Sequence, residues 1–317
     1  MPEARVGIEL NTVPLPLPGR GAQTQQAFAY ARACWPDGTA EEQRLLALHL
    51  ATILALDDTL ETGDPLPSAT EEQRALLPWC QAPCSFDRAQ EFASRKPVRE
   101  ALAHLDTALV TRAALDPSLP TPPLTDRPYA ADSAILWWRK QGEVMVAAIW
   151  QEALWRTSGI LPDEGLYLAV AEVSIGIGWI VATLLLLDGA RLAPRPDSLV
   201  VVATAAVAAA IRVANDLHET RRERREGKMQ LLFLRTRALQ ALGYRPRSAQ
   251  RRARQELLAE LSRRVTRARA LLDDQEWCES PRLRSGLLGM LGAALGMIHI
   301  HEPAAADPAA IAREPRR

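Results

Sequence analysis

Two short acidic segments of this 317-residue chain carry side chains that could bind a divalent cation. In the segment 212–223, one amide and two carboxylates, Asn215, Glu219 and Glu223, are spaced four and four. At about 100° per residue they fall on one stripe of a helix. The preceding run, 199–211, is almost entirely Val and Ala. We therefore expect a buried helix that ends in oxygen ligands, the kind of ligand that a hard divalent cation requires.

The second acidic segment follows another apolar run, 45–56, and contains Asp57, Asp58 and Glu61. Taken alone, this cluster is as consistent with solvated acids at a helix end as with a metal site. The alternative for the later segment is a surface helix braced by ion pairs between neighbouring turns. The presence of both clusters in one helical chain favours the metal site, and predicts a metal-bound diphosphate between them.

Helical patterning supplies the elements that must position these clusters. It begins near Gln23, and no segment shows the alternation of a strand. Thr39 is the expected cap of the helix that leads to Asp57. Within 163–188, two glycines predict a kink near 174–178. We expect an all-α fold with helices over about 40–62, 69–78, 86–94, 97–114, 130–157, 163–188, 197–241, 247–275 and 281–301.

Composition sets the domain plan and excludes several classes of protein. The chain has 38 basic and 38 acidic residues, which argues against a nucleic-acid or membrane-surface partner. The longest apolar stretches are interrupted by polar residues or are too short for a membrane span, so we expect buried helices. The N-terminus does not resemble a signal peptide, and the four cysteines are expected to be free thiols, which favours the cytoplasm. We expect an extended Pro-rich arm over 1–22, one helical domain over 23–301 and a flexible tail over 302–317.

The two acidic segments resemble the metal motifs of class I terpene synthases. The segment 57–61, Asp-Asp-Thr-Leu-Glu, is similar to their aspartate-rich motif in its variant ending in Glu. The segment 215–223 is similar to their second motif, Asn-Asp-x-x-Ser-x-x-x-Glu. Trp35-Pro36, upstream of the first motif, also matches the family pattern, so that the resemblance covers about residues 25–300.

The resemblance implies a function and a set of site residues. Such an enzyme ionises a prenyl diphosphate with magnesium, releases diphosphate, and cyclises or rearranges the carbocation in a deep apolar cavity. Three magnesium ions are implied, held by the first cluster on one wall and the second on the other. By this resemblance, the metal ligands are Asp57, Asp58, Glu61, Asn215, Glu219 and Glu223. Arg212 and Lys228 would bind diphosphate, and Ile175, Gly176 and Trp179 would line the pocket.

Three departures from the family pattern bear on the substrate. Glu219 stands where Ser or Thr is usual, the segment 167–176 lacks the Arg that bacterial members carry there, and His299-Ile300-His301 replaces a C-terminal Arg-Tyr pair. Arg212, three residues before Asn215, instead matches the plant-type pattern. This combination suggests a bacterial kaurene synthase-like diterpene synthase that uses a C20 substrate, either copalyl-type bicyclic or geranylgeranyl diphosphate.

Several alternatives stay open. The chain could be a sesquiterpene synthase that uses farnesyl diphosphate, or a non-catalytic helical homologue that binds prenyl diphosphate. A chain-elongating prenyltransferase would need a second Asp-rich motif, and a membrane prenyltransferase would need many membrane spans; neither is evident. The expected partner is the prenyl diphosphate, without nucleic acid or membrane insertion, and a homodimer is one possible state.

Overall fold

The computed structural model describes residues 21–61, 96–114, 133–190, 192–218, 230–275, 277 and 280–299. These ranges contain helices, turns and one isolated bridge between Ser133 and Leu192, but no strand. The all-α prediction is therefore confirmed. The helices are α1 (Gly21–Cys34), α2 (Ala40–Glu61), α5 (Lys96–Ala114), α6 (Ala134–Ser158), α7 (Glu164–Ser174), α8 (Ile177–Leu187), α9 (Leu199–His218), α11 (Leu231–Ala241), α12 (Pro246–Leu272) and α13 (Pro281–His299).

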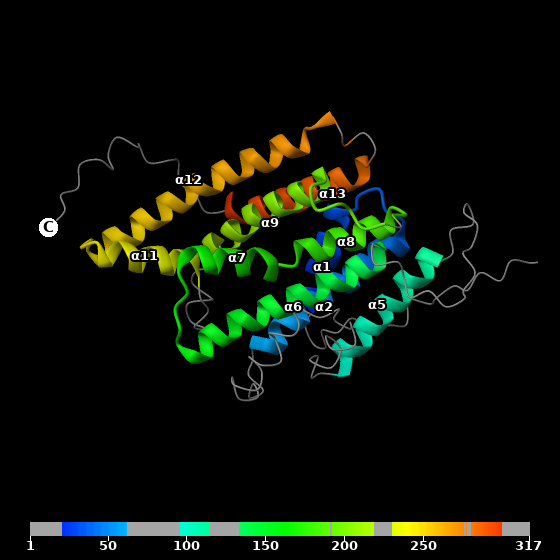
Figure 1. Cartoon of the computed structure of the whole chain (residues 1–317), viewed down its shortest axis with the longest axis horizontal. Coiled ribbons are helices and arrows are strands. Elements are labelled where there is room, and N and C mark those ends of the chain that lie inside the picture. The colour runs from blue at the N-terminus through cyan, green and yellow to red at the C-terminus, as the bar shows by residue number, and fades with distance from the viewer. Residues whose placement is uncertain are drawn as a thin grey trace, which may run out of the picture.

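The helices form a bundle in which α8 is the central element. Every residue of α8 except Gly178 is buried, because the helix packs against α2, α5, α6, α9 and α13. In Figure 1, α7 and α8 run between α6 and α9, and α12 lies on the far side of α9. One continuous apolar core joins residues from α1 through α13.

The helix that carries Asp57 is fixed at its start by a capping box. The Glu42 backbone N–H donates to Thr39 Oγ1 at 3.2 Å, and the Thr39 backbone N–H donates to Glu42 Oε2 at 2.9 Å. Arg282 of α13 also bonds Glu42 Oε2 at 3.1 Å. Thr39 is thus the cap that the sequence predicts, and α13 holds the start of α2 in place.

The predicted kink is a break between α7 and α8. Gly176 has a φ of 76°, a left-handed conformation that glycine adopts readily and other residues rarely do. A Cβ atom at this position would lie 2.9 Å from Met145 Sδ. Both observations explain why a glycine occupies the break.

The two most apolar segments, 164–187 and 199–218, are long enough to cross a membrane by length and composition alone. In their most apolar windows, 72% and 56% of the residues are buried inside the bundle. Both segments therefore pack as helices of the core. The sequence predicts this, because the apolar stretches are interrupted by polar residues or are too short for a membrane span.

Some predicted elements differ from the structure or lie outside the residues it describes. α1 begins at Gly21, two residues before the expected start. The predicted helix over 197–241 is represented by α9 and α11, and residues 219–229 between them lie outside the described ranges, as do the predicted helices at 69–78 and 86–94. Residues 1–20 of the expected arm over 1–22 and the tail over 302–317 are also outside them, so the domain boundaries stay predictions.

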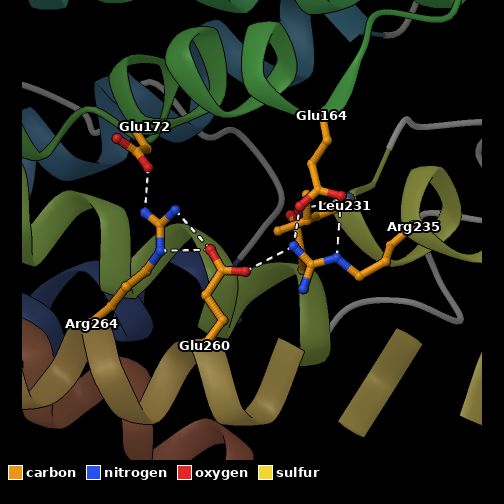
Figure 2. Close-up of polar contacts among 7 residues, drawn as sticks. Glu164, Glu172, Leu231, Arg235, Glu260 and Arg264 are labelled. Atoms are coloured by element: carbon orange, nitrogen blue, oxygen red, sulfur yellow. Dashed lines mark hydrogen bonds and ion pairs between the residues drawn. The ribbon is translucent and has the colours of Figure 1, made fainter. Parts of the chain in front are cut away.

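A ladder of alternating charges ties α7 to α11 and α12 (Figure 2). Arg235 of α11 bonds Glu164 of α7 through Nε at 3.2 Å, and Glu260 of α12 at 2.8 Å. Arg264 of α12 bonds Glu260 at 2.9 Å and Glu172 of α7 at 2.5 Å. We call these five residues the charge ladder; it joins α7 to α11 and α12 through hydrogen bonds and ion pairs.

Glu260, at the centre of the ladder, makes a testable contribution to stability. Burial alone would raise its pKa, but hydrogen bonds from Arg235 and Arg264 outweigh burial and the net pKa is lowered. A carboxylate whose folded pKa is lowered stabilises the fold above its unfolded pKa, about 4.3, and loses this effect as pH falls through the folded value. We expect Glu260→Gln to cost about 1.5 kcal/mol of unfolding free energy at neutral pH, and less below pH ~4.

The matched control is Glu256→Gln, one turn earlier in α12. Glu256 pairs with Arg252 at 2.8 Å, but their side chains are 39% and 41% exposed. We expect this variant to lose less than about 0.5 kcal/mol. Urea denaturation of both variants across pH 3–8 measures the difference, and equal losses would contradict a stabilising ladder.

Candidate active site

A cavity of about 660 Å³ lies between α6, α7, α8, α9 and the loop that precedes α9. Its walls are mainly aliphatic and aromatic, with few polar groups, as is typical of sites for small apolar molecules. The apolar lining residues are Trp137, Val144, Met145, Ala169, Val173, Trp179, Ala193, Pro194, Pro196, Val201, Ala205 and Ala208. The polar and charged lining residues are Gln141, Glu172, Arg195 and Thr204.

The cavity-lining face of α9 leads to the predicted second motif. Val201, Ala205 and Ala208 line the cavity, at the spacing of one helical face. The same face continues through Arg212 to Asn215, which is seven residues, or about two turns, after Ala208. Asn215 is partly buried near the end of the helix. Its amide is therefore at the C-terminal end of the helix face that forms one cavity wall.

Arg212 is held by side chains from three helices. It is 7% exposed. Its guanidinium lies 2.8 Å from Asp216 Oδ1 and 3.8 Å from Glu152 Oε1 of α6, and it also donates to the hydroxyl of Tyr167 on α7. The guanidinium carbon is 5.3 Å from the centre of the Tyr167 ring. These contacts hold the Arg212 guanidinium in a fixed position, and Arg212 precedes Asn215 by three residues in α9.

Asp216 points into the protein rather than along the Asn215 stripe. It is fully buried and accepts hydrogen bonds from the Tyr167 hydroxyl and the Leu231 backbone N–H, both at 3.0 Å. Burial raises the pKa of Tyr167, which keeps its hydroxyl protonated as a donor. Asp216 thus joins α9 to α7 and to the start of α11. Its role is structural.

The structure describes the side chains of two of the six predicted metal ligands, Asp57 and Asn215. Asp57 is partly buried and lies in the C-terminal part of α2. In Figure 1, α2 and α9 both run from right to left and end in the left half of the view. Asp58 and Glu61 belong to α2, but their side chains lie outside the described part of the chain. Glu219, Glu223 and Lys228 lie wholly outside it. Within the described residues, no three His, Cys, Asp or Glu side chains form a metal-binding group.

The three predicted pocket residues lie at or near the break in the α7–α8 segment. Trp179 lines the cavity, whereas Ile175 and Gly176 form the break itself. Sequence reasoning did not single out Tyr167 or Glu152, which hold Arg212. No sequence spacing connects these residues with Arg212, because they come from α7 and α6 and meet it only when the bundle forms.

The sequence profile described as "Terpene synthase family 2, C-terminal metal binding" matches residues 49–235, more than half of the chain. This range includes both Asp57 and Asn215. The chain belongs to the terpene synthase family. The protein is thus a terpene synthase with a metal-binding domain, and a lyase that acts on prenyl diphosphates. A comparison with curated proteins gives no significant match.

Solved structures of bacterial terpene synthases share the fold of this synthase. It is similar to 2-methylisoborneol synthase from Streptomyces coelicolor A3(2), determined with Mg2+ and 2-fluoroneryl diphosphate, at 18% identity and a TM-score of 0.61 over 90% of this chain and 85% of that chain. Germacradien-4-ol synthase from Streptomyces citricolor gives 19% identity and a TM-score of 0.59 over 89% and 88%. Linalool/nerolidol synthase from Streptomyces clavuligerus, with 2-fluorogeranyl diphosphate, gives 16% and 0.55 over 87% and 90%. At these identities the similarity shows the fold.

Proposed function

We propose that this synthase ionises a prenyl diphosphate in a magnesium-dependent reaction, releases diphosphate, and cyclises or rearranges the carbocation in the cavity between α6 and α9. The single observation that carries the proposal is the face of α9. Its apolar residues Val201, Ala205 and Ala208 line the cavity, and the same face reaches Asn215 two turns later, three residues after the buried Arg212. A site for a diphosphate thus adjoins a site for a hydrocarbon chain.

The proposed ligands in the C-terminal parts of α2 and α9 have the chemistry that magnesium requires. Asp57 and Asn215 offer a carboxylate and an amide oxygen, and both are partly buried near the ends of their helices. We propose that Asp57, Asp58 and Glu61 hold ions on one side, that Asn215, Glu219 and Glu223 hold one on the other, and that three ions bind in all. Bound magnesium would supply charge neutralisation for the diphosphate leaving group. The 2-methylisoborneol synthase structure contains Mg2+ together with a diphosphate analogue.

Arg212 and the cavity walls supply the other two requirements of the reaction. Asp216, Glu152 and Tyr167 orient the Arg212 guanidinium, and we propose that Arg212, with Lys228, binds phosphate oxygens. The apolar walls would surround the hydrocarbon part of the substrate, where few polar groups are available to quench the carbocation. The π faces of cavity-lining tryptophans would stabilise its positive charge.

We propose a C20 diphosphate, copalyl-type bicyclic or geranylgeranyl, as the preferred substrate. The support is the plant-type placement of Arg212 before Asn215, together with the cavity face of α7, where Ala169, Glu172 and Val173 include no cation. The cavity volume is in the usual range for small-molecule sites. The alternative is farnesyl diphosphate. Two of the similar structures carry analogues of the smaller geranyl and neryl diphosphates, so chain length needs a direct test.

The test is turnover of C10, C15, linear C20 and bicyclic C20 diphosphates with Mg2+, measured by diphosphate release and gas chromatography of the products. We expect kcat/KM for one C20 substrate to exceed that for farnesyl diphosphate by about tenfold or more. Removing magnesium with a chelator should abolish release. A preference for farnesyl diphosphate would make the chain a sesquiterpene synthase, and failure with every substrate would overturn the proposed reaction. A cytoplasmic location and a homodimer stay predictions.

A further inference from the structure

We propose that Thr183 and His49 are positioning residues that hold the Trp179 indole in one orientation in the cavity wall and thereby set the ratio of products. The proposal rests on the proposed function, because it concerns the carbocation formed in that cavity. Neither residue lines the cavity itself. They act through Trp179, which does.

A buried hydrogen-bond network lies directly behind the cavity wall. The Trp138 indole N–H donates to Thr183 Oγ1 at 2.8 Å, and Thr183 Oγ1 lies 2.8 Å from His49 Nδ1. The other acceptor near the Thr183 hydroxyl, the Trp179 carbonyl oxygen, is farther away, at 3.3 Å. His49 and Thr183 are both fully buried. The network thus joins α2, α6 and α8 at one point.

The indole of Trp179 is confined on several sides by this network. The His49 ring meets it edge to face, with 4.3 Å between ring centroids and 79° between ring planes. The centroids of the Trp138 and Trp179 rings are 5.5 Å apart. Behind it, Gly142 allows so close an approach that a Cβ there would lie 2.8 Å from Trp179 Cε2. Trp179 is 1% exposed, so its ring has little room to change rotamer.

The network also specifies the charge and tautomer of His49. The Thr183 hydroxyl has one proton and two acceptors nearby, and the shorter distance, 2.8 Å to His49 Nδ1 against 3.3 Å to the Trp179 carbonyl oxygen, favours donation to His49 Nδ1. The proton of the neutral imidazole is therefore on Nε2. Burial lowers the pKa of His49 to about 3, in agreement with a neutral ring. An imidazolium in this place would compete for the Trp179 π face and repel a carbocation beside it.

Stability alone does not account for this arrangement. Within the described part of the chain, His49 Nε2 and Trp179 Nε1 are buried without a hydrogen-bond partner. Such groups destabilise a fold relative to apolar side chains of similar shape. A neutral His49 ring that fixes Trp179 in the cavity wall explains why polar groups occupy the centre of the core.

The test compares two substitutions at Thr183 in the full chain, with the prenyl diphosphate that the wild type turns over best. Thr183→Val removes the hydroxyl but keeps the shape, and should change the ratio of the main products by about fivefold, the effect of about one cation–π contact. Thr183→Ser restores the hydroxyl and should return the wild-type ratio. His49→Asn retains an oxygen acceptor for Thr183 but removes the ring against Trp179, and should also change the ratio.

A matched control separates positioning from general destabilisation. Thr52→Val makes the same change at a fully buried position of α2, where the hydroxyl donates to the Leu48 carbonyl at 2.7 Å. It should lower the melting temperature without changing the product ratio. A wild-type ratio in both folded variants, Thr183→Val and His49→Asn, would overturn the proposal, as would an equal change in Thr52→Val.

A second measurement does not depend on turnover. The Trp179 indole N–H resonance, assigned by its loss in Trp179→Phe, should be single in the wild type and in Thr183→Ser, and should broaden or split in Thr183→Val. An unchanged single resonance in Thr183→Val would overturn the proposal. If the wild type converts no prenyl diphosphate, the proposed function fails, while this resonance still decides whether Thr183 positions Trp179.

Discussion

Replacing Asn215 with Ala is expected to lower product formation by about a thousandfold or more, with any prenyl diphosphate that the wild type accepts. Asn215 is the proposed metal ligand of α9 whose side chain the structure describes. It lies on the same face of α9 as the residues that line the cavity. Its loss would remove an oxygen donor for magnesium, so that the diphosphate would keep its charge and remain a poor leaving group. Asp57→Ala should have a similar effect, since Asp57 is the proposed donor from α2.

The control for these two variants is Asp273→Ala. Asp273 and Asp274 form another Asp-Asp pair in the sequence, but Asp273 follows the end of α12 and its side chain is 69% exposed. We expect product formation within about twofold of the wild type, since an exposed ion pair contributes little. Single-turnover diphosphate release at saturating magnesium measures all three variants. Full activity in Asn215→Ala or Asp57→Ala would remove that residue from the proposed metal site.

Replacing Asp216 with Asn is expected to destabilise the protein by about 3 kcal/mol. The substitution removes the carboxylate that lies 2.8 Å from the buried Arg212 guanidinium; the Glu152 carboxylate of α6 lies farther away, at 3.8 Å. It also places an amide where Tyr167 and Leu231 both donate to a single carboxylate oxygen. A buried charge without its partner is costly, and the contacts from α9 to α7 and α11 weaken together.

Asp106→Asn is the matched control for Asp216→Asn. Asp106 binds Arg139 through two hydrogen bonds of 2.8 and 2.9 Å, but these side chains are 19% and 26% exposed. Water can solvate both charges after the change, so we expect a loss of about 1 kcal/mol. Urea denaturation followed by circular dichroism gives both values. If the two variants lose the same stability, burial of the Asp216–Arg212 pair is not what makes it important.

The local features of this protein could be predicted from the sequence because they depend on neighbouring residues. Helical spacing, the Thr39 cap and the two glycines at the kink determine where helices begin and break, and the structure confirms these features. The two acidic motifs are likewise local patterns, and the match to residues 49–235 confirms the family that they indicate. The ligand roles of all six proposed residues stay predictions, and for Asp58, Glu61, Glu219 and Glu223 the side chains also lie outside the described ranges.

The arrangement of the site, in contrast, was decided by the packing of helices that are distant in the sequence. Arg212 meets Glu152 and Tyr167 across 60 and 45 residues, and His49 meets Thr183 across 134. A sequence shows which residues can form an ion pair or a hydrogen bond, but distance and burial select the pairs that do form. The same packing turns the second residue of the Asn-Asp pair inward as a structural group. It also places Trp179 in the cavity wall with a buried histidine behind it, a contact that no spacing in the chain records.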